Sequence, residues 1–419
     1  MPDVSHDFYS HSHKEMRYVA PGGTPIRLND LTNWIYNIVA ADDVLEAFRQ
    51  EICTAFKVKH CFFVSTGRAA LCVLLQSLIQ LSGKEKNEVV IPSYTCFSVP
   101  SSVAKTGLKI RICDIDPDTL DYDLRKLAEI DFSNVLCIIT SNLYGVPNDV
   151  KQIGQIAKDN NVFLIDDAAQ CMGGKVDGKY SGTTGNAGLY SLDRGKNITS
   201  MDGGILLTDL DDLASCIKSN ITDLPDLTAG RKISYIAKFL LYATFLHPRL
   251  YWIPDSLPFL KLGATVYTTK YPIGSYNYLL GAMGLQLFRK IHEITAVRTK
   301  NASYLKEHLS NVPFLKVPCF RDYVSPVYLR FPVLVQDELL RDNILKKLNQ
   351  KGIGATRSYP SSIDDISEIQ DIIVNKDADF EGGHQVAGRI LTLPTHHYVS
   401  ESDLANMASL IKEIVNGHS

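Results

Sequence analysis

Two patterns of apolar residues alternate along the first half of the chain. The segments 44–56 and 68–81 have the apolar spacing of helices. Short apolar runs around and after them predict strands, at 61–65, 88–92, 108–115, 135–140 and 162–167. This alternation is typical of an α/β domain built on a largely parallel sheet. Because ligands of such sheets bind at the carboxyl ends of the strands, we expect the chemistry of the protein there.

The pattern changes after residue 210. An insert at about 220–270 contains two proline-bearing clusters, and a helical run at about 279–309 follows it. The runs FLKVPCF, YLRFPVLV and ILTLPT then resemble strands, and 337–352 and 400–416 resemble amphipathic helices. The predicted organisation is an N-terminal extension at 1–43, a large domain at 44–300 with a helical insert at about 220–270, and a smaller C-terminal α/β domain at 301–419.

The most apolar stretch, 233–246, lies inside the insert. It is too short to span a bilayer, and Lys238 interrupts it. The wider segment 233–260 lacks the Lys/Arg-rich polar face of a helix that lies on lipid. We therefore expect burial in the core or in a subunit interface, with contact to a membrane surface as the alternative.

Composition narrows the classes of function. The 419 residues are 45% hydrophobic and 21% charged, with a net charge of -3, which predicts binding neither to nucleic acid nor to an anionic membrane. Any anionic ligand must therefore be bound by a local group of donors or basic side chains, because the net charge of the protein does not attract it. The nine cysteines contain no CxxC pair and predict a reduced, cytoplasmic protein without a zinc site. The N-terminus has no apolar signal region, and His6, His11 and His13 fit a polar terminus better than a metal site.

Two segments carry candidate binding groups. VSTGRAAL, at 64–71, predicts a strand, a turn at Gly67 and a helix, whose first amides can bind an anion. The same pattern also occurs as ordinary connecting structure. VFLIDDAAQ, at 162–170, ends a strand with Asp166 and Asp167, which either cap the next helix or face a site.

The third candidate is Lys196, which lies in the Gly-containing segment 188–204. A lone lysine is usually a solvated surface group, but one in a tight loop at the end of a sheet can lose its proton and bond to a carbonyl. An anion cradle, a buried carboxylate and an amine at one sheet edge are together what pyridoxal 5′-phosphate (PLP) requires. The combination is much more specific than each part.

At this point the chain resembles the DegT/DnrJ/EryC1/StrS family of PLP-dependent sugar aminotransferases, from about residue 44 to the C-terminus. The motifs that carry the resemblance are VSTGRAAL, IPSYTCFS, CDIDPDTLDYD, NLYGVPNDV, IDDAAQ, YSLDRGKN followed by DGG, KGIGATRSYP and ILTLPTHHYVSESDL. The resemblance implies the aspartate-aminotransferase fold (fold type I), with a large PLP-binding domain and a small C-terminal domain. It also implies a homodimer with shared active sites.

The resemblance also implies roles for single residues. Lys196 would form the Schiff base with the cofactor aldehyde and move protons, and Asp167 would pair with the pyridine nitrogen. Gln170 would lie near the phenolic oxygen of the ring. The phosphate would be held by Ser191 and by the backbone at Gly67, Arg68 and Ala69.

Several positions depart from the family pattern. Arg68 stands where the family has a small Thr, and Cys96 stands where an aromatic residue usually stacks on the ring, so Tyr94 or Phe97 is expected to serve instead. Asp193, Arg194 and Gly195 precede the lysine in place of the usual Tyr-Pro-Thr type. The partner subunit's phosphate contact aligns loosely with Ser275 or Asn277 of this sequence.

These observations predict a cytoplasmic aminotransferase that moves an amino group from Glu or Gln to a keto-sugar. The sugar is expected to be nucleotide-linked, and the product to serve polysaccharide, glycolipid or secondary-metabolite biosynthesis. Arg194, Arg231, Lys232 and Arg357 are candidates for a basic cluster that holds the substrate. One alternative is a sugar dehydratase, although such family members carry His in place of Lys196. The other is a regulatory protein that retains PLP without turnover.

Overall fold

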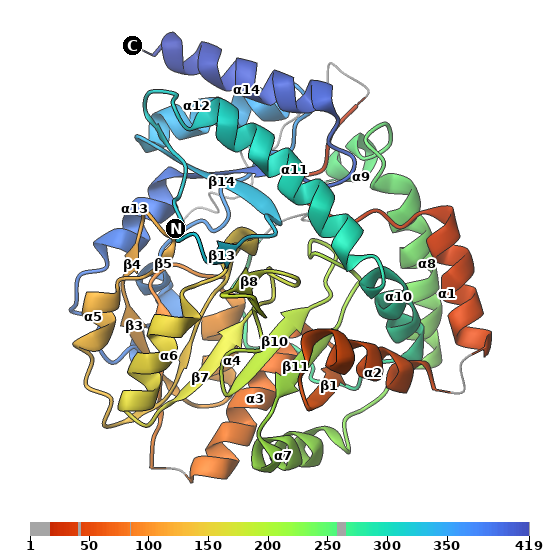
Figure 1. The fold of residues 1–419 in the computed structure, drawn as a ribbon, viewed down its shortest axis with the longest axis vertical. Helices are drawn as coiled ribbons and strands as arrows, with labels where there is room; N and C mark the ends of the chain where they lie inside the picture. Colours follow the sequence, from red (N-terminus) through yellow and green to blue (C-terminus); the bar gives the residue numbers. More distant parts are fainter. Residues whose placement is uncertain (1–16, 41–42, 84, 258–264, 419) are drawn as a thin grey trace.

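The computed structural model describes residues 17–40, 43–83, 85–257 and 265–418, and a seven-stranded sheet lies at its centre (Figure 1). In spatial order the strands are β1 (His60–Val64), β11 (Gly204–Thr208), β10 (Ala187–Ser191), β7 (Phe163–Asp167), β6 (Val135–Ile139), β2 (Glu88–Pro92) and β3 (Lys109–Cys113). Adjacent strands from β10 to β3 pair in parallel, whereas β11 is antiparallel to both of its neighbours. The mostly parallel α/β fold predicted from the sequence is therefore confirmed.

Helices cover both faces of this sheet. One face packs against α3 (Gly67–Ser82), α4 (Ser98–Lys105) and α7 (Asp211–Ile221). The other face packs against α2 (Val44–Phe56), α5 (Leu124–Ala128), α6 (Val150–Asp159) and α10 (Tyr278–Phe288). Side chains of the central strands, such as β2, are buried on both faces, which explains why they form continuous apolar runs in the sequence.

A second, antiparallel sheet lies in the C-terminal part of the chain. It consists of β12 (Leu315–Lys316), β14 (Arg330–Val335) and β15 (Ile390–Pro394). Its core includes residues of α11 (Ile291–Leu309), α12 (Glu338–Gln350) and α14 (Glu401–Asn416). Only two residues of the run FLKVPCF form a strand, because Pro318 follows them and cannot donate a ladder hydrogen bond.

Shorter elements connect these parts. They are the hairpin β4 (Ile115–Asp116) and β5 (Asp121–Tyr122), the small sheet of β8 (Lys175–Val176), β9 (Lys179–Tyr180) and β13 (Val324–Ser325), and the helices α9 (Trp252–Asp255) and α13 (Glu381–Arg389). The helical run expected at 279–309 is two helices, α10 and α11, because the chain turns at Arg289 and Lys290.

Local capping explains where several predicted helices begin. Asp43 caps α2 and Asp337 caps α12, each through a side-chain oxygen that accepts first-turn amides. Ser400 and Asp403 form a capping box at the start of α14. The helices predicted at 44–56, 68–81, 337–352 and 400–416 appear as α2, α3, α12 and α14 within two residues.

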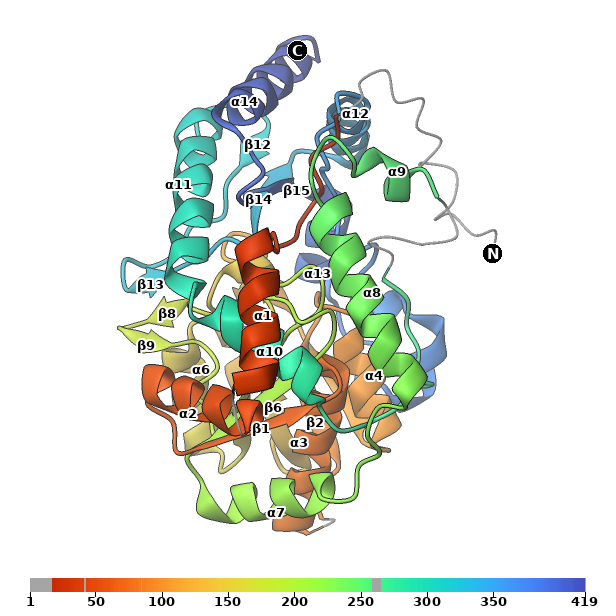
Figure 2. The same cartoon turned by 90° about the vertical axis from the view of Figure 1, so that its right-hand side faces the viewer.

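Two helices, one before the large domain and one in the insert, lie side by side on one flank (Figures 1 and 2). They are α1 (Leu28–Ala40), in the N-terminal extension, and α8 (Ala229–Phe245), in the insert. Their contact includes the rings of Trp34 and Phe239, with centroids 5.1 Å apart. The histidines at 6, 11 and 13 lie outside the described residues.

The apolar stretch at 233–246 is only partly covered. Phe239 is buried against α1, but Ile233, Ile236, Leu240 and Leu241 are exposed, by 39 to 68%. These four residues, called here the α8 stripe, lie on one side of the helix. The core of the chain itself therefore does not bury them. Among the described residues, no helix has the length and apolar character needed to cross a membrane.

Candidate active site

The ends of β7 and β10 bring three predicted residues to one edge of the sheet. The two strands run in parallel, and Asp167 is in register with Leu189, two residues before Ser191. The chain leaves β10 at Ser191 and reaches Lys196 through a turn in which the Lys196 amide donates to the Asp193 carbonyl at 3.1 Å. This is the carboxyl edge on which the sequence predicted the chemistry.

The two neighbouring aspartates have different environments. Asp166 is fully buried and accepts hydrogen bonds from Thr140, Asn142, Gly182 and Thr184 at 2.6 to 3.1 Å. Asp167 accepts one from the Ala169 amide, at 2.9 Å. A turn follows Asp167, not a helix, so helix capping does not explain the pair. Asp166 stabilises the fold, which leaves Asp167 as the carboxylate able to act on a ligand.

Asp167 and Lys196 are electrostatically coupled. Burial raises the pKa of Asp167 to about 6, while the Ala169 amide and the positive charge of Lys196 oppose that rise. The Lys196 amine has no hydrogen bond or ion pair to any of the described residues. A carboxylate and an amine that feel each other's charge, each with capacity for another partner, could hold a ligand that carries a ring nitrogen and a carbonyl.

Gly67 lies directly against Ser191. A Cβ atom built on Gly67 would come within 2.9 Å of both the Cβ and the Oγ of Ser191. Only glycine therefore allows the start of α3 to approach the end of β10. The first-turn amides of α3 and the Ser191 hydroxyl thus lie at one place, which suits a phosphate group.

Thr66, which the sequence analysis did not select, caps α3. Its hydroxyl accepts the Ala69 amide at 3.0 Å, so the predicted Ala69 donor already has a partner in the chain. The guanidinium of Arg68 lies over the ring of Tyr271, 4.9 Å from the centroid. These contacts favour a backbone role for Arg68 in anion binding. A Thr before a helix is a standard N-cap signal, and it could have indicated Thr66.

Gln170 contacts Tyr359, which lies in the C-terminal part of the chain. The Gln170 amide donates to the Tyr359 hydroxyl at 2.8 Å, and its oxygen accepts the Tyr144 amide at 3.2 Å. Tyr359 also lies beside Cys96, which contributes to raising the pKa of the Tyr359 hydroxyl, although burial is the larger cause. Tyr359 was not selected from the sequence, because nothing near it in the chain indicates contact with residue 170.

The three candidates for ring stacking surround Tyr359. Tyr94 is fully buried, and its hydroxyl bonds to that of Tyr144 at 3.1 Å and to the Tyr359 backbone. The Phe97 ring stacks on Tyr359 with centroids 6.5 Å apart. Cys96 is half-buried. Tyr94 thus already bonds to Tyr144 and Tyr359, which leaves Phe97 and Cys96 as the more accessible of the three candidates.

Asn277 is engaged within its own chain. Its side chain caps α10 by accepting the Leu279 amide at 3.0 Å, and it donates to Asp226 at 3.0 Å. Ser275 also donates to Asp226, at 3.4 Å. A contact from Asn277 to the phosphate in a partner subunit would require the Asp226 bond to be exchanged.

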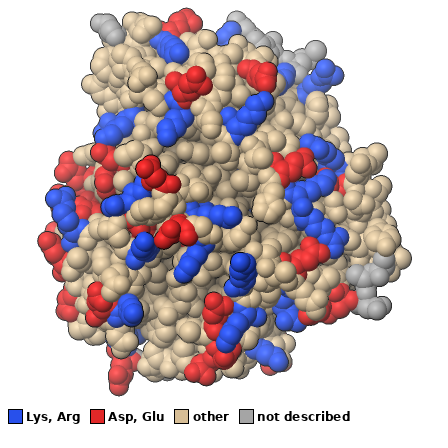
Figure 3. Space-filling view, viewed as in Figure 1, with Lys and Arg blue, Asp and Glu red and all other residues tan. Residues whose placement is uncertain are grey.

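The predicted basic cluster is largely paired within the chain. Lys232 forms an ion pair with Asp226 at 3.0 Å, and Arg194 lies 3.8 Å from Asp193. Arg357 lies 3.8 Å from both Glu338 and Asp342, and Arg231 is exposed. Positive and negative side chains are interspersed over the face in Figure 3, as the net charge near zero suggests. Substrate charge would therefore have to be held by few groups.

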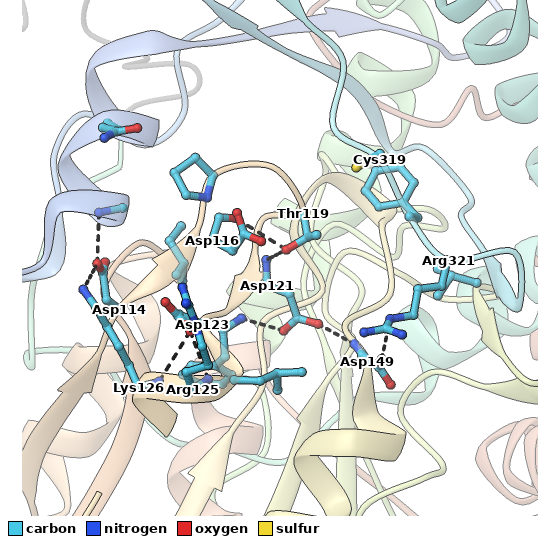
Figure 4. A pocket seen from close by; sticks show the side chains of 18 of the residues that line it. Asp114, Asp116, Thr119, Asp121, Asp123, Arg125, Lys126, Asp149, Cys319 and Arg321 are labelled. Carbon is cyan, nitrogen blue, oxygen red and sulfur yellow. Dashed lines mark hydrogen bonds and ion pairs between the residues drawn. The ribbon is translucent and has the colours of Figure 1, made fainter. Parts of the chain in front are cut away.

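A pocket of about 560 Å³ lies elsewhere, between the β4–β5 hairpin, α13 and the segment 319–324 (Figure 4). Its carboxylates have partners within the chain: Asp114 binds Lys126 and the Gly382 amide, and Asp149 binds Arg321. Burial raises the pKa of Asp121 to about 7. None of the predicted site residues lines this pocket, and its contacts join α13 and the segment 319–324 to the hairpin.

Comparison with known proteins assigns the chain to a family. The model of the DegT/DnrJ/EryC1/StrS aminotransferase family matches residues 35–221 and 275–412. The chain belongs to this family. Membership confirms the resemblance found in the sequence and the class of a PLP-dependent aminotransferase. The unmatched residues 222–274 coincide with the predicted insert.

Relatives of this family member include aminotransferases and dehydratases. It is 24% identical to the GDP-perosamine synthase of Caulobacter vibrioides, over 92% of each chain. It is also 24% identical to the GDP-4-keto-6-deoxy-D-mannose 3-dehydratase of Yersinia pseudotuberculosis, over 76% of this chain and 77% of that one. The Escherichia coli dehydratase of this name, with bound hydrated PLP, has the same fold: the TM-score is 0.76 at 18% identity, over 95% of this chain and 100% of that chain.

Proposed function

We propose that the protein transfers an amino group from glutamate or glutamine to a nucleotide-linked keto-sugar, with Lys196 and Asp167 as its catalytic residues. The observation that supports this most is the coupling of Lys196 to Asp167 at the strand ends. The Gly67–Ser191 contact lies at the same edge of the sheet. The aminotransferase relatives support the sugar as acceptor.

The groups at this edge fit PLP. The first amides of α3 and the Ser191 hydroxyl would hold the phosphate, Asp167 would face the ring nitrogen, and Gln170 would lie by the phenolic oxygen. When bound, PLP supplies an aldehyde that links to amines and a ring that withdraws electrons from the attached carbon. Burial raises the pKa of Asp167 and so disfavours its ionised form in the cofactor-free protein. A protonated ring nitrogen beside this partly buried carboxylate would favour the ionised form again.

Lys196 would act as the base and acid of the reaction. Its amine would accept a proton from the carbon of the amino donor and return it to the cofactor side. This requires an unprotonated amine held close to the reacting carbon. The short turn after β10 restricts where the Lys196 backbone can lie. Once Asp167 pairs with the ring nitrogen, its carboxylate is no longer free to stabilise a protonated Lys196 amine.

Lys196 argues against the first alternative, because a sugar dehydratase of this family would be expected to carry His at this position. A regulatory protein that retains PLP could hold it through the same lysine, so turnover with an amino donor is what separates that alternative. The dehydratase relatives share the scaffold, so the distinction rests on this side chain.

The choice of acceptor can be tested with a substrate panel. We expect holoenzyme with glutamate to aminate at least one GDP-, dTDP- or UDP-linked 4-keto-6-deoxy sugar at least about 100-fold faster, in kcat/KM, than pyruvate or oxaloacetate. Mass spectrometry of the sugar product would measure the transfer. The sugar assignment fails if a keto acid reacts as fast as every keto-sugar tested. Loss of the 3-hydroxyl without amination would support the dehydratase instead.

We further propose a cytoplasmic homodimer with its domains divided near residue 300. All nine cysteines are free thiols, as expected for a reducing compartment. The α8 stripe is an apolar surface, and Tyr36 and Val39 of the neighbouring helix α1 are also exposed, which suits a subunit interface. The insert would then contribute to the dimer rather than to a membrane anchor.

Replacing Leu240 of the α8 stripe by aspartate should weaken the dimer. A charge buried at a subunit contact costs several kcal/mol unless it is paired, so sedimentation should show a shift toward monomer at micromolar concentration. Leu339→Asp, at an 82% exposed position of α12, is the matched control and should leave the mass unchanged. Flotation of the wild type with liposomes, abolished by Leu240→Asp, would instead support the membrane alternative.

A further inference from the structure

Two segments outside the family match converge on the loop that carries Lys196. Residues 222–274 and the residues before 35 are not matched by the family model. The first segment supplies Tyr242, from α8, and the second supplies Thr24, from the chain that leads into α1. Features of the family as a whole therefore do not explain what these two residues do at the loop.

Tyr242 binds the loop on one side of Lys196. Its hydroxyl donates to the Arg194 carbonyl at 2.8 Å and accepts the Thr24 amide at 3.2 Å. Burial raises the pKa of Tyr242, so the hydroxyl keeps the proton that it donates. Gly23 makes this approach possible: its φ is +139°, and a Cβ atom there would lie 2.9 Å from the Tyr242 hydroxyl oxygen.

Thr24 binds the loop on the other side. Its side chain is 1% exposed, and its hydroxyl lies 2.7 Å from the Asn197 carbonyl and 3.1 Å from the Lys196 carbonyl, to which it can donate. Arg298, which is fully buried, donates to the same hydroxyl at 3.2 Å and to the Gly23 carbonyl at 2.8 Å. The orientation of the Thr24 hydroxyl toward the loop is thereby fixed.

These bonds reach backbone carbonyls that no side chain of the loop contacts among the described residues. The Asn197 amide group is buried but has no hydrogen-bond partner among those residues, and the Arg194 side chain is exposed. The carbonyls of Arg194, Lys196 and Asn197 are instead held by Tyr242 and Thr24 together. The position of the Lys196 backbone thus depends on two residues that are distant from it in the sequence.

We propose that Tyr242 and Thr24 are positioning residues that hold Lys196 in the geometry required for bonding to PLP. The inference rests on the proposed role of Lys196. A displacement of about 1 Å at a reacting group can cost a factor of about 100 in rate, so loss of either hydroxyl should be measurable. The insert would then have a second role besides its proposed subunit contact, since it completes the active site of its own chain.

The test compares PLP capture by cofactor-free wild type, Tyr242→Phe and Thr24→Val. Stopped-flow absorbance should show capture slowed about 10-fold or more in both variants, and the induced circular dichroism of bound PLP should decrease because the ring is held less uniformly. In turnover, kcat should fall with little change in KM for the keto-sugar. These readouts separate positioning from a general loss of stability, which thermal unfolding measures independently.

Two hydroxyl deletions serve as matched controls. Tyr251→Phe removes a hydroxyl from the same insert, where the ring stacks on Tyr18 with centroids 5.8 Å apart. Thr299→Val removes one that bonds only within α11, at 2.9 Å to the Thr295 carbonyl. Both should capture PLP at the wild-type rate.

The outcomes distinguish this inference from the proposed function. Borohydride reduction of wild-type holoenzyme followed by peptide mass spectrometry comes first, and a pyridoxyl group on another lysine overturns the proposed site. If Lys196 is labelled but Tyr242→Phe and Thr24→Val both match the wild type in capture rate and dichroism, the positioning role is wrong. If Tyr242→Phe does not fold, Thr24→Val alone decides.

Discussion

Replacing Lys196 by alanine should reduce transamination by about 10⁴-fold or more, because the variant loses both the covalent link to PLP and the group that moves the proton. The phosphate contacts proposed at Gly67 and Ser191 do not involve this side chain, so the variant should still bind PLP. The visible absorbance of lysine-bound cofactor should be lost. Equilibrium dialysis, absorbance spectra and single-turnover kinetics would measure the three effects.

An exposed lysine provides the control for this experiment. Lys218 lies on the solvent side of α7, and Lys218→Ala should match the wild type in all three measurements. Visible absorbance that persists in Lys196→Ala would mean that another amine holds the cofactor. Activity within 10-fold of the wild type would contradict the mechanism itself.

The sequence allowed the sheet edge to be predicted because the residues there lie next to their strands. Asp167 ends β7 and Lys196 follows β10 by five residues, so parallel pairing alone brings them together. Gly67 follows β1 in the same way. The apolar runs mark the strands, and the residue after each run is thereby placed at the site without knowledge of side-chain contacts.

The remaining site residues could not be found in this way. Tyr359 reaches Gln170 across 189 residues of chain, and Thr24 reaches Lys196 across 172. Such contacts depend on how the C-terminal part of the chain and the N-terminal segment pack around the central sheet, which no local pattern encodes. The different roles of Asp166 and Asp167 were also hidden, since they depend on donors from Gly182 and Thr184 that lie after β9.

Asp167→Asn should slow transamination by about 100- to 1,000-fold while leaving PLP bound to Lys196, because the ring nitrogen loses the charge that keeps it protonated. The same change should stabilise the cofactor-free protein. Burial raises the pKa of Asp167 from 3.8 to about 6, so the ionised carboxylate costs the folded state about 3 kcal/mol at neutral pH. Asparagine carries no charge and avoids this cost.

The sign of this effect gives a pH dependence that can be measured by thermal unfolding. The folded state holds the Asp167 proton up to about pH 6, whereas the unfolded chain releases it near 3.8, so wild-type stability falls relative to the variant between these values. The gain in melting temperature from Asp167→Asn should therefore be larger at pH 8 than at pH 5. With PLP bound, the wild type should instead have the higher melting temperature, because only its carboxylate can form an ion pair with the ring nitrogen.

Asp166→Asn separates this electrostatic effect from a loss of structure. Asp166 accepts four hydrogen bonds, and an amide in its place turns one acceptor into a donor that faces other donors. This variant should be less stable by a few kcal/mol at pH 5 and pH 8 alike. If Asp167→Asn also destabilises the cofactor-free protein at pH 8, or gains as much as the wild type from added PLP, then Asp167 is not the partner of the ring nitrogen. The expected pattern is that Asp167→Asn is more stable than the wild type without PLP and gains less stability when PLP is added. This pattern is expected if the Asp167 carboxylate pairs with a cationic group of the ligand.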